Sequence, residues 1–314
     1  MSKRKSPKNT LPAPIVRAEQ FPSAQALYRF SILDRRNAEF VQAATARVAH
    51  TPMFEEALTR DTPAIQQIKA TQTLAELLDL VPLSSGLAQR AWLDQMRLFR
   101  LGAAPLIAER LKAAAAIEDE KGHDIAEERL IAALHLCGDL GAEQLRLCFD
   151  TLSLYGQSLA CLVLGKAKVQ TAADRIWAYY QQVQDDAAQN FLIGPLWALV
   201  DLHDPRAPGA LAELLMDGRD FPELYGLLAL AGDAQAVWPL VVRILQTSKD
   251  ENRDLVLALA AISHRLGRPA LRAELEKWVA PKDKAALPDK MAETFLRYQP
   301  KDIQDYFQIF YSRP

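Results

Sequence analysis

A short phrase recurs along this chain at intervals of about 33 residues, and it has the composition of a turn between two helices. Clear copies are LHDPRA at 202–207, LAGDAQA at 230–236 and LCGDLGA at 136–142. Weaker copies are LGAAP at 101–105, LGKA at 164–167 and LGRPA at 266–270. Such a repeat is typical of proteins in which consecutive helix pairs stack side by side. It therefore predicts an array of helical hairpins.

The residue types at these turns have a physical reason. Gly232 can adopt the left-handed backbone that ends a helix, and Asp233 can then accept a hydrogen bond from the free N–H groups of the next helix. In the copy at 202–207, Asp204 is the expected cap and Pro205 the first helical residue, where a missing N–H is not needed. Apolar residues at helical spacing follow each turn. We therefore expect one helix to end and another to begin at every copy.

The period is imperfect. Equivalent points in the six copies are Gly102, Gly138, Gly165, His203, Gly232 and Gly267. The spacings between them are 36, 27, 38, 29 and 35 residues, an order of long and short intervals that the sequence does not explain. The alternative to a repeat array is a set of unrelated helical hairpins.

Composition supports helices and excludes several classes of protein. Half of the residues are hydrophobic, alanine and leucine dominate them, and runs of β-branched residues are few, which predicts an all-α fold. The net charge of −2, with both signs interspersed, argues against nucleic acid as the partner, although a local basic patch would escape this count. The cysteines, Cys137, Cys148 and Cys161, have no metal-ligand spacing, and we expect them to be reduced, buried and small apolar residues.

Nothing in the sequence predicts a membrane segment. The basic start is not followed by the apolar region of a secretory signal, and the longest apolar run, at 191–200, is too short to span a bilayer. We therefore expect a soluble, cytoplasmic protein that does not bind membranes.

Four regions follow from these patterns. Residues 1–22 are expected to be a basic, proline-containing tail that is either disordered or an electrostatic arm for an acidic partner or nucleic acid. Residues 23–86 are expected to be an irregular N-terminal helical cap, and residues 87–280 the repeat array. Residues 281–314 are expected to be a C-terminal capping helix with an aromatic tail, which either packs on the core or hooks onto another chain.

The turn phrases resemble HEAT-like repeats of the short, bilin-lyase type. The resemblance is carried by LHDPRAPGALAELL at 202–215 and AGDAQAVWPL at 231–240, and it extends over about two thirds of the chain. It implies a right-handed α-solenoid whose second helices line a concave face that grips a protein partner. It does not imply a particular partner.

We find no specific catalytic or metal-binding pattern. The five histidines are scattered and none has the spacing of a metal site. One helical turn carries His123, Asp124, Glu127 and Glu128, which would hold a cation, but an exposed acidic loop is the simpler interpretation. We therefore expect neither a metal nor a cofactor.

One pair suggests an alternative function. Trp197 and Asp201 are four residues apart and share a helix face. They resemble the tryptophan–aspartate pair of HEAT-like alkylpurine DNA glycosylases, in which the aspartate stabilises a cationic sugar and aromatic residues hold the damaged nucleotide. Asp201 lies at the end of its helix, however, and the chain lacks the basic excess that gripping DNA requires.

The sequence favours a non-catalytic scaffold that binds a protein. Arginines follow several turns on the expected second helices, and one is accompanied by aromatic residues, a composition that is frequent at interfaces. The alternative is that each arginine lies on a solvated helix face. The candidate binding residues are Arg110, Arg146, Arg175, Trp177, Tyr180, Arg243 and Arg272.

Overall fold

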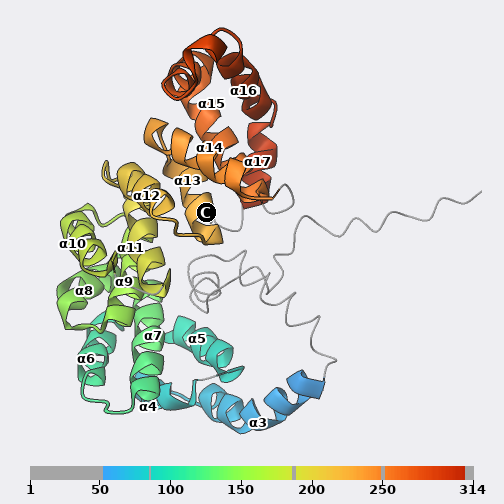
Figure 1. The fold of residues 1–314 in the computed structure, drawn as a ribbon. Helices are drawn as coiled ribbons and strands as arrows, with labels where there is room; N and C mark the ends of the chain where they lie inside the picture. The colour runs from blue at the N-terminus through green and yellow to red at the C-terminus, as the bar shows by residue number, and fades with distance from the viewer. Residues whose placement is uncertain (1–51, 85, 186–188, 249–251, 308–314) are drawn as a thin grey trace, which may run out of the picture. The chain divides into compact units, whose positions relative to one another are not determined.

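The computed structural model describes residues 52–84, 86–185, 189–248 and 252–307 (Figure 1). Every regular element in these ranges is a helix, which confirms the all-α prediction. No described helix has the length and apolar character needed to cross a membrane. The predicted tail at 1–22, the first part of the predicted cap and the last seven residues lie outside the described ranges.

Short helices follow one another along the chain, and the predicted turns join them in pairs. The pairs begin after α3 (Pro52–Lys69), α4 (Leu74–Asp79) and the short helix η2 (Val81–Leu83). We call each pair of helices joined by a predicted turn a hairpin: α5 (Ala88–Phe99) with α6 (Ala104–Ala114), α7 (Glu120–Leu136) with α8 (Asp139–Cys148), α9 (Leu154–Lys166) with α10 (Ala173–Val183), α11 (Gln189–Asp201) with α12 (Ala207–Met216), and α13 (Pro222–Ala231) with α14 (Val237–Gln246). The chain then forms α15 (Arg253–Glu276), α16 (Leu287–Leu296) and α17 (Pro300–Phe307).

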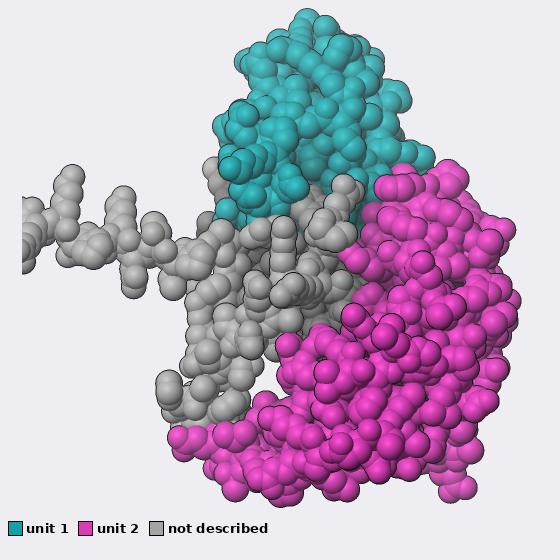
Figure 2. Space-filling model, turned by 180° about the vertical axis from the view of Figure 1, so that it is seen from behind, with its two compact units in different colours: residues 1–24, 211–313 teal, residues 25–210, 314 magenta. Residues whose placement is uncertain are grey.

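The described residues fall into two compact units, which Figure 2 draws in different colours. One contains residues 52–210 and the other residues 211–307. The division lies within α12, inside the region 87–280 that the sequence predicts to be the repeat array.

In the unit of residues 52–210, the first helices of successive hairpins form a row. Helix α5 packs on α7, α7 on α9, and α9 on α11, while α6 and α8 pack beside them. Helices of successive hairpins in this unit thus contact one another. Buried side chains fill the space between helices; Trp92, Ile107, Ile131, Phe149 and Leu196 are all at most 1% exposed.

Small residues let α9 and α11 approach closely. A Cβ atom added to Gly165 would lie 2.5 Å from the Cα atom of Ala198, and one added to Gly194 would lie 2.0 Å from the carbonyl oxygen of Ser158. Both helices are also apolar on nearly every side, and residues 159–165 of α9 and 192–200 of α11 are all buried. The pair therefore forms the interior of its unit.

In the unit of residues 211–307, α15 is the central element. It packs against α13, α14, α16 and α17, and it bends sharply at Gly267, where φ is 74°. Arg265 lies just before this bend, and its guanidinium donates to the carbonyl oxygens of Leu228, Ala229 and Gly232. These carbonyls lie at the end of α13, where that of Leu228 also accepts from the backbone N–H of Gly232, so Arg265 binds α15 to the end of α13.

The predicted turns occur at all six positions, but two of the predicted turn residues are wrong. Gly102, Gly138 and Gly267 have positive φ as expected, and His203 has a φ of 54°. In the third turn Lys168, with a φ of 57°, takes this conformation, whereas Gly165 lies inside α9. Gly232 has a φ of −56°. Placing the third turn at Lys168 lengthens the shortest interval and shortens the longest one.

Side chains of one turn bind the end of the neighbouring helix. The Lys168 ammonium donates to the carbonyl oxygen of Asp201, and the Gln170 amide donates to that of Leu202 at 3.2 Å. These carbonyls lie at the C-terminal end of α11, where acceptors lack intrahelical donors. The turn of the third hairpin thus fixes the position of the fourth.

The prediction that Asp204 caps a helix starting at Pro205 is wrong: α12 begins at Ala207, and Asp204 binds the turn before it. Asp204 is 8% exposed, and its Oδ1 accepts from the backbone N–H of Arg206 at 2.9 Å and from the Arg206 Nε at 2.8 Å. A further bond joins its Oδ2 to the same guanidinium at 2.6 Å. The Arg206 guanidinium lowers the pKa of Asp204, and the backbone N–H adds to this effect. The carboxylate is thus stabilised in its charged form.

We predict that Gly165→Ala destabilises the protein by about 1–3 kcal/mol, because the added methyl group would meet the backbone of Ala198. Chemical denaturation followed by circular dichroism measures the effect. An unchanged or higher midpoint would contradict the close approach, since alanine otherwise favours a helix over glycine by about 1 kcal/mol.

We also predict that Asp204→Asn lowers stability at neutral pH by about 1–2 kcal/mol. A carboxyl whose pKa is lowered by folding stabilises the native state above its ordinary pKa, and this contribution is lost as pH falls. The difference between wild type and variant should therefore shrink below about pH 4. Thermal unfolding from about pH 7 to about pH 3 measures it, and a difference independent of pH would contradict the ionic role.

Candidate functional site

The five predicted arginines all lie on second helices or on α15, but each is already in an ion pair. The pair of Arg110 with Asp79 joins α6 to α4, and Arg175 also donates to the Arg146 carbonyl oxygen at 2.7 Å. These contacts hold neighbouring elements together. The pairs are Arg110–Asp79 at 2.6 Å, Arg146–Glu143 at 2.7 Å, Arg175–Asp150 at 3.5 Å, Arg243–Asp220 at 3.1 Å and Arg272–Glu276 at 2.9 Å.

The aromatic residues predicted beside Arg175 are less accessible than expected. Tyr180 is 1% exposed and packs in the core, so the predicted binding role does not fit this residue. Its ring lies 5.3 Å from that of Trp177, which is half-buried. The Arg206 guanidinium lies over the Trp177 ring at 5.1 Å. One face of Trp177 is thus already in contact with this chain.

The structure does not favour a glycosylase role for Trp197 and Asp201. Trp197 is 2% exposed within α11. A ring buried in the helix stack cannot hold a nucleotide that arrives from solvent. The backbone carbonyl of Asp201 is bound by Lys168, which places this residue in the contact between hairpins.

The acidic residues Glu127 and Glu128 of α7 bind residues at the start of α9 and do not form an exposed loop. Glu127 is 2% exposed and accepts from the backbone N–H of Ser153 at 2.9 Å and from its hydroxyl. The neighbouring Glu128 accepts from the Tyr155 hydroxyl at 2.9 Å. Glu127 therefore binds the start of α9, and His123 lies 3.6 Å from it. Within the described ranges, no group of three or more potential ligands lies close enough to hold a metal.

The structure buries two of the three thiols that the sequence predicts to be buried. Cys148 and Cys161 are buried and Cys137 is half-buried, and none of the three forms a disulfide. Burial raises the pKa of all three thiols, which favours the neutral form. A neutral buried thiol is a poor nucleophile.

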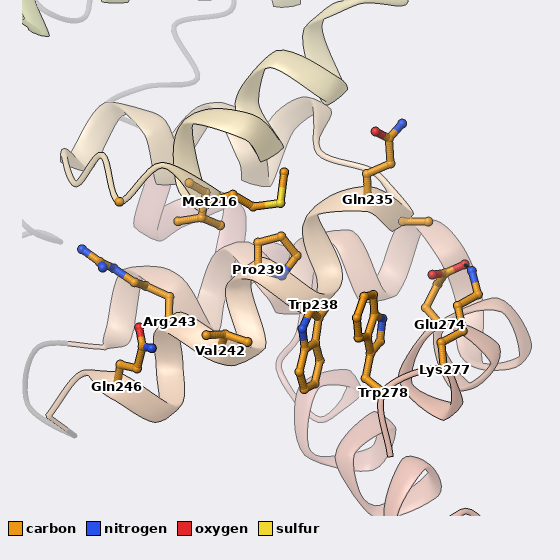
Figure 3. A pocket seen from close by; sticks show the side chains of 13 residues that line it. Met216, Gln235, Trp238, Pro239, Val242, Arg243, Gln246, Glu274, Lys277 and Trp278 are labelled. Carbon is orange, nitrogen blue, oxygen red and sulfur yellow. Dashed lines mark hydrogen bonds and ion pairs between the residues drawn. The ribbon is translucent and has the colours of Figure 1, made fainter. Parts of the chain in front are cut away.

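A groove of about 460 Å³ lies on the second helices of the unit of residues 211–307 (Figure 3). We call it the tryptophan groove. It is formed by the end of α12, by one face of α14 and by the end of α15. Its lining comprises Leu215, Met216, Gly218, Ala234, Gln235, Trp238, Pro239, Val242, Arg243, Gln246, Glu274, Lys277 and Trp278.

Two stacked indole rings dominate this groove. Trp238, in the first turn of α14, and Trp278, just beyond α15, lie 4.9 Å apart at an interplanar angle of 4°. Trp278 is 52% exposed and the neighbouring Met216 is 64% exposed. Large, partly exposed aromatic and thioether side chains at one place are the usual anchors of a protein interface.

Polar groups around the indoles include several hydrogen-bond donors. The Arg243 Nη2 donates to Asp220 at 3.1 Å, but its Nε is buried and has no acceptor among the described residues. Gln235 and Gln246 also line the groove. A buried donor without a partner destabilises a protein.

Only one residue of this groove is predicted from the sequence. Arg243 is among the predicted binding residues, whereas Trp238 and Trp278 are not. Trp238 directly follows a turn phrase, which places it at the start of a second helix, but nothing in the sequence pairs it with Trp278. The stacking joins the first turn of α14 to the residues just beyond α15, which meet only after folding.

Comparison with known proteins adds no assignment: no protein-family model, no curated protein and no solved structure matches the chain.

Proposed function

We propose that this protein is a non-catalytic helical-repeat scaffold that binds another protein. The observation that carries the proposal is the stacked Trp238–Trp278 pair in a groove with an exposed methionine. The HEAT-like resemblance supports the binding role and implies a right-handed superhelix whose second helices line a concave face. The three free cysteines support a reducing, cytoplasmic location.

The chemistry of the groove suits a peptide chain better than a small charged substrate. Its walls are apolar and aromatic, and the charged Glu274 and Lys277 on its rim pair with each other. Gln235 and Gln246, which also line the groove, carry amide groups of the kind that bind the carbonyl oxygens of a backbone. An indole pair of this size gives contact area with few rotatable bonds, which limits the entropy lost on binding.

We predict that Trp278→Ala weakens partner binding by about thirtyfold, because removing a central interface tryptophan typically costs about 2 kcal/mol or more. Immobilised full-length protein would capture the partner from the native cell, and calorimetry with the purified partner would then measure affinity. Trp278 is about half exposed, so the variant should unfold close to the wild-type temperature.

Leu245→Ala is the matched control. Leu245 lies on α14 and is 78% exposed, but it does not line the groove. Its substitution should leave the partner bound. Equal affinities for wild type and Trp278→Ala would contradict binding at the tryptophan groove.

A further inference from the structure

We propose that Met216 is a site of reversible oxidation by peroxides, and that its sulfoxide weakens binding at the tryptophan groove. This inference rests on the proposed binding role of the groove. Met216 is the last residue of α12, and it carries the one sulfur atom among the described residues that line the groove. Figure 3 shows its side chain on the α12 side of the groove, across from Pro239 of α14.

Exposure distinguishes Met216 from the other methionines whose side chains the structure describes. Met216 is 64% exposed, whereas Met96 is fully buried and Met291 is half-buried. A peroxide reaches a thioether through solvent, so the susceptibility of a methionine to oxidation follows its exposure. We therefore expect Met216 to react first among these three residues.

The reaction needs only an accessible sulfur and a peroxide. The Met216 sulfur attacks one oxygen of the peroxide, so an S–O bond forms while the O–O bond breaks. The sulfur loses two electrons and the peroxide is reduced. The departing hydroxide takes the proton of the transferred hydroxyl and leaves as water. The product is a sulfoxide, which methionine sulfoxide reductases convert back to the thioether.

Oxidation would change the wall of the groove that a partner contacts. Met216 shares this wall with apolar side chains of α14, those of Trp238, Pro239 and Val242. A thioether is flexible and apolar and makes favourable contacts with aromatic rings, whereas a sulfoxide is polar and holds water. Covering the sulfoxide with an apolar partner would remove that water without replacing its hydrogen bonds. We expect the oxidised groove to bind its partner about tenfold more weakly.

The first measurement locates the oxidation. Full-length protein is treated with dilute hydrogen peroxide, and mass spectrometry of its peptides gives the rate at each methionine. Met216 should be oxidised at least about tenfold faster than the buried Met96, and also faster than Met291. Equal rates for Met216 and Met96 would overturn the proposal, whatever the groove binds.

The second measurement follows the groove itself in protein labelled with 5-fluorotryptophan. Peroxide treatment should shift the fluorine resonances of Trp238 and Trp278, which line the groove, and should leave that of Trp92, buried in the other unit, unchanged. Met216→Leu, which keeps an apolar side chain of similar size, should show no shift after the same treatment. Unchanged Trp238 and Trp278 resonances in protein oxidised at Met216 would contradict an effect on the groove.

The third measurement is affinity, by calorimetry with the partner purified for the Trp278→Ala comparison. Peroxide should weaken binding to the wild type about tenfold and leave Met216→Leu unaffected, and the methionine sulfoxide reductases should restore the wild-type affinity. Equal losses in both proteins would overturn the proposal, because they assign the effect to another residue, such as the half-buried Cys137. Failure of the proposed function is distinguishable, since it appears as equal affinities of wild type and Trp278→Ala before any oxidation.

Discussion

The structure depends on the need of short helices to be covered by their neighbours. Helices of ten to thirteen residues, such as α5, α8 and α9, are marginal alone in water. Their stability comes from burying apolar faces against the helices before and after them. Helices α9 and α11 show the constraint most strongly, because almost every side of each is apolar, and glycine at positions 165 and 194 brings their backbones together. The turns between consecutive helices then determine which helix packs beside which.

The fold class and the positions of the turns could be predicted because they are local properties. Leucine, glycine and a capping residue within a few positions are enough to mark a helix end, and the described helices begin and end near every copy of the phrase. The conformation of each turn residue could not be predicted. Glycine favours left-handed backbone, which predicts Gly165 at a turn, yet the chain uses this residue for close packing and places Lys168 in the strained conformation.

The candidate site was less predictable than the fold. An arginine after a turn lies on the second helix, as Arg243 does, but whether its guanidinium is free depends on residues elsewhere in the chain, such as Asp220. Periodicity alone does not separate a core position from a partly exposed one close to it, as the burial of Tyr180 beside the half-buried Trp177 shows. The tryptophan groove arises from three elements that meet only after folding.

The order of contacts along the chain has a kinetic consequence. In both units the helices that pack together are neighbours or next neighbours in sequence, so few long loops must close before native contacts form. Chains with such a low contact order fold fast, and their early helices can acquire partners while later ones are still being synthesised. The bond between Tyr306 and Asp254 spans a longer stretch than most and closes only once the final helix is present.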